Sequence, residues 1–296
     1  MCSPCYPPWS RTPLMLAVAP MPRGYGSSVS AVGFVKGLQD GPYLKGSSDG
    51  TARLTVCYFL QTVTSMTFSS QRIIILTERY RALDGVWGSW GLTLALAYSQ
   101  THPERVTELV LRGIFLLRQR EIAWFYQQGA SALYPDAWEP YWNHIPEERR
   151  GDMLGAYHRR LTSEDSAVRH AAAKIWSGWE GATSKLMPDA AFTAHYEEDE
   201  FALAFARIEA HYFVNKGFFE SDAQLLENAF RIRHIPGVIV QGRYDVVCPM
   251  ESAWALHRAW PEAELLVTAD SGHSAFDPPN SRALVAATDR FTGDAK

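Results

Sequence analysis

The 296-residue sequence is poor in cysteine and contains no long hydrophobic run. Its cysteines, Cys2, Cys5, Cys57 and Cys248, are too few and too scattered for a disulfide framework. This favours a reducing compartment and predicts a cytoplasmic protein. Cys2 and Cys5 have no second pair and no neighbouring histidine, so no zinc site is expected there. No apolar run approaches the ~20 residues that cross a bilayer, so membrane association is not expected.

A strong excess of charge is also lacking, since the formal net charge is −4. This balance gives no reason to expect nucleic acid or an anionic membrane as a partner. The sequence has no H-E-x-x-H motif or comparable set of metal ligands, so a metallopeptidase is not expected. No cofactor is predicted, and nothing in the sequence indicates the oligomeric state.

Two parts of the chain differ in composition. Residues 1–39 contain no acidic residue, all nine histidines follow residue 100, and nine of the ten tryptophans follow residue 86. We expect residues 1–85 to be an atypical, partly disordered amino-terminal segment, with strands only at 52–63 and 72–76. Its acid-free, Ser-, Pro- and Gly-rich start is typical of a disordered leader or of an organellar transit peptide.

Beyond residue 86 the pattern becomes regular and alternates strands with helices. The expected elements are a helix at 92–100, a strand at 106–115, a helical region at 119–230, a strand at 237–245, a helix at 251–260, a strand and loop at 263–273, and a helix at 281–291. This order predicts an α/β fold with a parallel sheet. Residues 86–118 and 231–296 would form its core, and residues 119–230 a helical cap inserted into it.

Three residues that suit acyl-transfer chemistry follow one another in the predicted loops. Ser89 lies in Gly-Ser-Trp-Gly before a helix, Asp245 follows an apolar strand, and His273 lies in Ser-Gly-His-Ser. Loops at the carboxyl ends of parallel strands gather at one edge of the sheet. A serine hydroxyl becomes a nucleophile when an imidazole takes its proton, and a carboxylate orients that imidazole. The order Ser, Asp, His is that of the α/β-hydrolases.

Each of the three also has an ordinary explanation. Ser89 could cap a helix, Asp245 could cap a loop, and His273 could be a polar loop residue. Asp270 and Asp277 are alternative partners for the histidine. Asp270 lies only three residues from His273 and Asp277 lies beyond it among prolines, so Asp245 fits the acid role better.

The segments "GSWGLTLALAYSQTHPERVTELVLRGIFLLR", "WEGATSKL", "FALAFARIEAHYF", "IRHIPGVIVQGRYD" and "SGHS" closely resemble the prolyl aminopeptidase (proline iminopeptidase) family. These are serine peptidases of the α/β-hydrolase fold, and the resemblance covers about residues 88–291. It implies that Ser89 is the nucleophile, Asp245 the orienting acid and His273 the general base. The backbone N–H of Trp90 would contribute to the oxyanion hole.

The resemblance also implies the substrate, small peptides that begin with proline. The family recognises the free amine with carboxylates from the cap, and the matching residues here are Glu180 and Glu209. Two acids in a partly dry pocket would attract the ammonium strongly and replace its lost water contacts. The alternative places both glutamates on solvated helix faces. Four aromatic residues could wall a proline pocket or belong to the core: Trp176, Trp179, Phe205 and Tyr212.

The sequence departs from the family pattern near the nucleophile and before it. Trp87 stands where the family has the first glycine of Gly-x-Ser-x-Gly, and residues 1–85 lack the His-Gly-Gly-Pro-Gly loop that supplies half of the oxyanion hole. Loss of one oxyanion donor lowers the rate about 10²–10³-fold, so impaired activity is expected. The amino-terminal strands of the core would be missing or replaced, as in the product of an alternative transcript or an imperfect gene model.

Three functions therefore remain open. The first is a serine aminopeptidase acting on an N-terminal proline. The second is a catalytically dead relative that binds peptides or is unstable, which the missing oxyanion loop favours. The third is another serine hydrolase such as an esterase, against which the two cap glutamates argue.

Overall fold

The computed structural model describes residues 54–55, 73–76 and 89–292. Within this part of the chain, five parallel strands form one sheet in the order β1-β2-β3-β4-β5. The strands are β1 (Leu54–Thr55), β2 (Ile73–Leu76), β3 (Glu108–Arg112), β4 (Gly237–Gly242) and β5 (Glu264–Thr268). Both β3 and β4 are buried along their whole length, and both have an apolar middle: β3 carries a charged residue at each end, and β4 has one amide near its carboxyl end.

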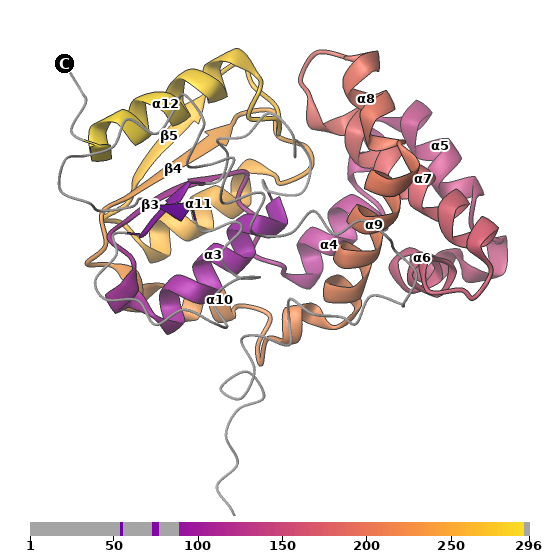
Figure 1. Ribbon diagram of the computed structural model, residues 1–296, viewed down its shortest axis with the longest axis horizontal. Coiled ribbons are helices and arrows are strands. Elements are labelled where there is room, and N and C mark those ends of the chain that lie inside the picture. The colour runs from indigo at the N-terminus through magenta and orange to yellow at the C-terminus, as the bar shows by residue number, and fades with distance from the viewer. Residues whose placement is uncertain (1–53, 56–72, 77–88, 293–296) are drawn as a thin grey trace, which may run out of the picture.

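Helices cover both faces of this sheet (Figure 1). They are α3 (Ser89–Thr101), α10 (Gln224–Glu227), α11 (Met250–Ala259) and α12 (Pro278–Thr292). Side chains alternate across a strand, so Leu109 and Leu111 of β3 pack with α3 and α11. Val110 points to the opposite face and packs with Leu284 of α12. The sheet is therefore the middle of three layers.

A block of helices lies beside the sheet, between β3 and β4 in the chain (Figure 1). This helical block comprises α4 (Gln119–Tyr126), α5 (Pro135–Asn143), α6 (Met153–Leu161), α7 (Ser166–Ser184), α8 (Ala190–Tyr196) and α9 (Asp199–Val214). Short 3₁₀ helices are η3 (Pro103–Arg105), η4 (Ala130–Ala132), η5 (Glu147–Asp152), η6 (Lys216–Phe218) and η7 (Ala229–Ile232). None of the helices in the described ranges is long and apolar enough to cross a membrane.

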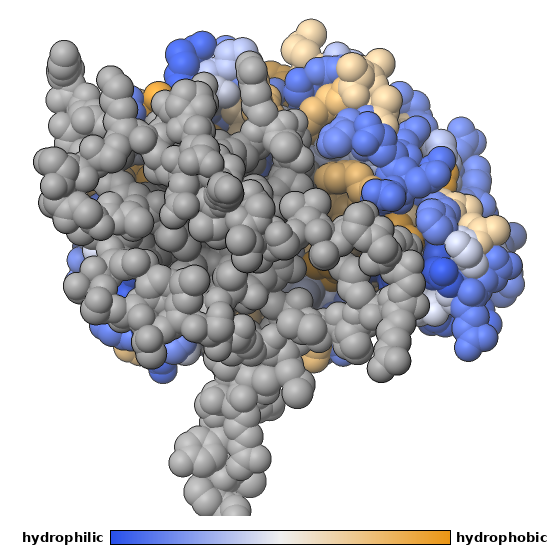
Figure 2. All heavy atoms as spheres, viewed as in Figure 1, coloured by the Kyte–Doolittle hydropathy of each residue, from blue (hydrophilic) through white to orange (hydrophobic). Residues whose placement is uncertain are grey.

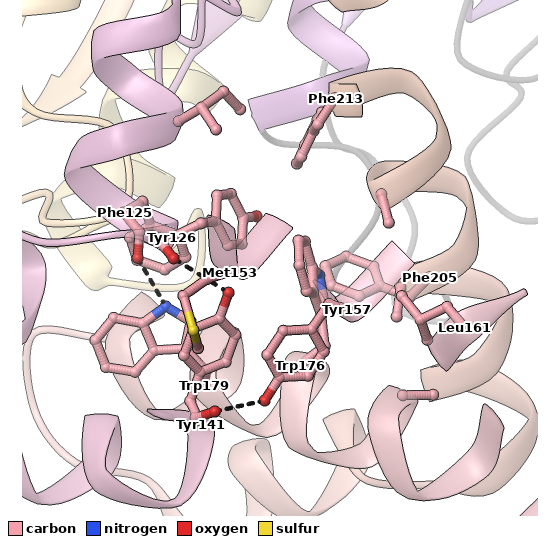
Figure 3. Close-up of a cluster of buried hydrophobic side chains, with 14 of the residues drawn as sticks. Phe125, Tyr126, Tyr141, Met153, Tyr157, Leu161, Trp176, Trp179, Phe205 and Phe213 are labelled. Carbon is pink, nitrogen blue, oxygen red and sulfur yellow. Dashed lines mark hydrogen bonds between the residues drawn. The ribbon is translucent and has the colours of Figure 1, made fainter. Parts of the chain in front are cut away.

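Aromatic side chains fill the interior of the helical block (Figure 3). The Tyr141 and Tyr157 rings stack with centroids 4.5 Å apart, and the Tyr157 hydroxyl donates to the Tyr141 carbonyl at 2.7 Å. The Trp179 indole donates to the Phe125 carbonyl at 3.2 Å. Buried rings whose polar atoms are paired fix the helices relative to one another. The outer edge of the block is largely hydrophilic (Figure 2).

The expected elements differ from the observed ones mainly at their ends. The helix expected at 92–100 begins at Ser89, and η3 follows it at Pro103. The strand expected at 106–115 ends at Arg112, because Gly113 has a φ of +58° and leaves the extended conformation. Strands β1 and β2 lie within the ranges 52–63 and 72–76. The rest of residues 1–85, Trp87 and the side chain of Ser89 lie outside the described residues.

Candidate active site

An imidazole and a carboxylate meet at the carboxyl ends of β4 and β5. The Nδ1 atom of His273 lies 2.9 Å from Oδ2 of Asp245. Asp245 follows β4, and His273 lies in the loop after β5. Both residues are buried, with 5% and 8% of their surface exposed. A buried carboxylate on Nδ1 selects the tautomer that leaves Nε2 free to accept a proton.

Two further bonds hold the Asp245 carboxylate. Oδ1 accepts from the backbone N–H of Cys248 at 2.7 Å, and Oδ2 accepts from the side-chain amide of Gln241 at 2.9 Å. The same amide nitrogen donates to the Cys248 carbonyl, and the amide oxygen accepts from the N–H of Ile114. Gln241 is not among the site residues expected from the sequence. A single amide inside the apolar strand "GVIVQG" is the signal that could have found it.

Glycine is required beneath the imidazole. Gly113 adopts a φ of +58°, and a Cβ at this position would lie 2.8 Å from Cε1 of His273. The preceding residue, Arg112, is buried and donates from its guanidinium to the His273 carbonyl. The end of β3 therefore supports both the ring and the backbone of His273.

The amino terminus of α3 carries the expected nucleophile. Ser89 is the first residue of this helix and Trp90 the second. The first N–H groups of a helix have no partner within the helix, and its dipole favours negative charge there. The Trp90 ring is buried against α9, with its centroid 4.4 Å from that of Tyr212 and 6.0 Å from that of Phe213. The start of α3 is thus in contact with the helical block.

The two glutamates of the helical block are buried. Glu180 on α7 and Glu209 on α9 are each only 4% exposed, so the alternative of solvated helix faces is wrong. The Tyr126 hydroxyl donates to Oε1 of Glu180. The Trp176 indole donates to Oε2 of Glu209 at 2.9 Å. All four candidate aromatic residues, Trp176, Trp179, Phe205 and Tyr212, belong to the buried core of the block, and Tyr212 also contacts Trp90.

Burial controls the protonation of these glutamates. Burial raises the pKa of Glu180 to about 7. Hydrogen bonds with Tyr126 and Glu209 lower this pKa in part, and the negative charge of Asp245 raises it further. Burial, and then the charge of Glu180, raise the pKa of Glu209 well above its ordinary value. The pair therefore retains a proton near neutral pH, and a cation that displaced this proton would gain two acceptors.

The other two acidic residues near His273 have different surroundings. Asp270 is exposed. Asp277 is buried, and its Oδ2 accepts from the backbone N–H groups of Gly272 at 2.6 Å and of Leu186 at 3.4 Å. Neither is the partner of the His273 Nδ1, which is Asp245. Across the described residues, no group of three or more His, Cys, Asp and Glu side chains could hold a metal ion.

Comparison with known proteins places the chain in a family. Residues 87–278 match the family model described as the alpha/beta hydrolase fold. The chain is 64% identical over 204 residues to a probable proline iminopeptidase of Leptolyngbya boryana, covering 69% of this chain and 64% of that protein. It is 65% identical over 204 residues to a proline iminopeptidase of Xylella fastidiosa (strain Temecula1 / ATCC 700964), covering 69% of this chain and 65% of that protein.

A third relative is covered more fully. The chain is 63% identical over 220 residues to a proline iminopeptidase of Xanthomonas citri, covering 72% of this chain and 70% of that protein. The chain spans slightly less than two thirds of the length of the Leptolyngbya and Xylella proteins. With the hydrolase-fold match over residues 87–278, these identities show that the chain belongs to the proline iminopeptidase family of the α/β-hydrolase fold.

Proposed function

We propose that the chain is a serine aminopeptidase that releases N-terminal proline from small peptides. The observation that carries this proposal is the buried pair Glu180 and Glu209, which lies on two helices of the helical block. The names of the relatives support the same activity. In this proposal the helical block, within residues 119–230, is a cap over the site.

In this proposal Ser89, His273 and Asp245 carry out acyl transfer. Ser89 attacks the carbonyl carbon of the proline residue while Nε2 of His273 takes the hydroxyl proton. Asp245 keeps the Nδ1 proton in place and stabilises the imidazolium. The imidazolium then gives its proton to the departing amine. Water, activated by the same imidazole, attacks the acyl-enzyme and releases proline and Ser89.

The amino terminus of α3 would stabilise the tetrahedral intermediate. The N–H of Trp90 lies in the first turn, where the helix leaves donors unpaired and its dipole favours an oxyanion. Each such donor contributes about 10²–10³-fold to the rate. Trp90 is therefore proposed as one oxyanion donor.

The free amine of the substrate would bind the glutamate pair. A prolinium nitrogen carries two N–H groups and one positive charge, which match one oxygen from each carboxyl group. Its binding would displace the proton that burial retains on Glu180 and Glu209. A peptide with a blocked amino terminus cannot make this exchange, so the site would select exopeptidase substrates.

A location in the cytoplasm is part of the proposal. It is supported by the low cysteine content and by Cys248, a free buried thiol. The expected partners are small peptides with an N-terminal proline, and neither nucleic acid nor a membrane is proposed as a partner.

The decisive experiment measures release of a fluorescent arylamine from a prolyl-arylamide by the purified chain. Turnover should disappear in Ser89→Ala and persist in Ser99→Ala, a matched serine on α3 that bonds only to the Ala95 carbonyl of its own helix. Absence of turnover from chain shown to be folded would contradict the proposal and favour a catalytically dead relative. Hydrolysis of p-nitrophenyl acetate without cleavage of the prolyl-arylamide would instead favour an esterase.

A further inference from the structure

The backbone around His273 is held by side chains of the sheet layer. The Asn280 amide donates to the carbonyls of Gly272 at 3.1 Å and of Ser274 at 2.8 Å, on either side of the histidine. Asn280 is fully buried, and its amide oxygen accepts from the Thr268 hydroxyl. These bonds fix the loop to β5 and α12.

The opposite side of the same loop is bonded to the helical block. The N–H of Ser274 donates to the Ser184 carbonyl at 2.8 Å. The Asp277 carboxylate accepts from Gly272 in the loop and from Leu186, two residues beyond the end of α7. One buried carboxylate therefore bridges the histidine loop and the end of a helix that is distant in the sequence.

The packing at this junction leaves no room for a side chain. A Cβ on Gly272 would lie 2.9 Å from the Leu186 nitrogen, 3.2 Å from the Ser184 carbonyl oxygen and 3.3 Å from Oδ2 of Asp277. Contacts this short require the neighbours to move. The end of α7 rests directly on the backbone next to His273.

The bonded end of α7 is one turn from the glutamate. The Ser184 hydroxyl donates to the Glu180 carbonyl at 2.8 Å, and Ser184 lies four residues after Glu180, a rise of about 6 Å along a helix. A shift of this helix end would carry Glu180 with it. The interior of the helical block is tightly packed, so α7 transmits such a shift rather than absorbing it.

We propose that Asp277 is a positioning residue that ties α7 to the His273 loop and thereby sets the separation between Glu180 and the catalytic base. The proposal rests on the proposed aminopeptidase function. A fixed separation between Glu180 and His273 suits a substrate in which the ammonium group and the scissile carbonyl belong to the same residue. A displacement of about 1 Å between such groups lowers the rate about 10²-fold.

The first test compares two substrates that differ in their need for the glutamates. Asp277→Ala should lower kcat/KM for a prolyl-arylamide about 10²-fold. It should change the hydrolysis of p-nitrophenyl acetate little, because this ester has no amine to align. Asp277→Asn, which retains an acceptor oxygen, should restore most of the loss. Gly272→Ala should mimic Asp277→Ala, and Asp270→Ala, in the same loop but exposed, should resemble the wild type.

The second test needs no turnover. Hydrogen exchange followed by mass spectrometry should show faster exchange in Asp277→Ala both in the peptide that contains Leu186 and in the peptide that contains residues 272–274. Unchanged exchange at Leu186, or an equal loss on both substrates, would overturn the proposal and leave Asp277 as a local brace. If the wild type cleaves no prolyl-arylamide, the proposed function fails, while the exchange experiment still decides whether the tie exists.

Discussion

Replacement of Glu180 by glutamine should stabilise the folded chain at pH 8 and not at pH 4. The folded state raises the pKa of this carboxyl group, chiefly by burial, from 4.5 to about 7. Between these two values the folded chain holds a proton that the unfolded chain has released. Stability is therefore present in full below about pH 4.5 and is lost as the pH rises towards 7.

The size of this loss follows from the two values. The difference between 4.5 and about 7, at 1.36 kcal/mol per pKa unit, corresponds to about 3 kcal/mol of unfolding free energy. Glutamine keeps an acceptor for Tyr126 and offers a donor to Glu209 without a charge to desolvate. Glu180→Gln should therefore raise Tm at pH 8 by about 6–12 °C.

Thermal unfolding followed by circular dichroism at pH 4, 6 and 8 measures this effect. The gain of Glu180→Gln over the wild type should grow with pH across the series. Glu200→Gln, an exposed glutamate in the first turn of α9, is the matched control and should give no such trend. A Glu180→Gln protein that is equally stable as the wild type at pH 8, or less stable, would refute the reasoning that burial raises this pKa.

Two further predictions concern the support of His273. Asp245→Asn changes the carboxylate that accepts from Nδ1 of His273 and should lower kcat on a prolyl-arylamide about 10⁴-fold. The far-ultraviolet circular dichroism spectrum should change little. A loss of kcat below tenfold would show that another group orients the imidazole. Gly113→Ala forces a left-handed backbone on alanine and should lower the unfolding free energy in urea by about 1–2 kcal/mol. Its kcat should fall as well, because the new methyl group displaces the His273 ring, and an unchanged kcat would contradict this placement.

Much of the fold could be predicted from the sequence, because each strand of the core is a short apolar run between helices. The same pattern placed Asp245 and His273 after neighbouring strands, where parallel topology brings them together. The burial of Glu209 could also be predicted from the sequence. It shares a helix face with Phe205 and Phe213, four residues to either side, and both are buried. This spacing of four residues places Glu209 on a buried helix face and argues against the solvated face that was the alternative.

The residues that support the site through hydrogen bonds to its backbone could not be predicted from the sequence. Asn280, Arg112 and Asp277 bond to backbone groups that lie up to 161 positions away in the chain. Such partners depend on how the ends of strands and helices meet the loops after folding, and a single polar residue at such a position carries no sign of them. Gln241 was the exception, since an amide inside a buried strand must find partners.

The aromatic contact between Trp90 and Tyr212 limits how this protein could diverge. Trp90 directly follows the proposed nucleophile, and Tyr212 belongs to the last long helix of the helical block. A new substrate could be accommodated by exchanging that block while the sheet layer stayed the same. Each replacement would still have to pack a side chain against the Trp90 ring at the start of α3, or a smaller residue at position 90 would have to accompany a larger one from the new block. The identities at positions 90 and 212 should therefore change together among relatives, although one residue belongs to the sheet layer and the other to the helical block.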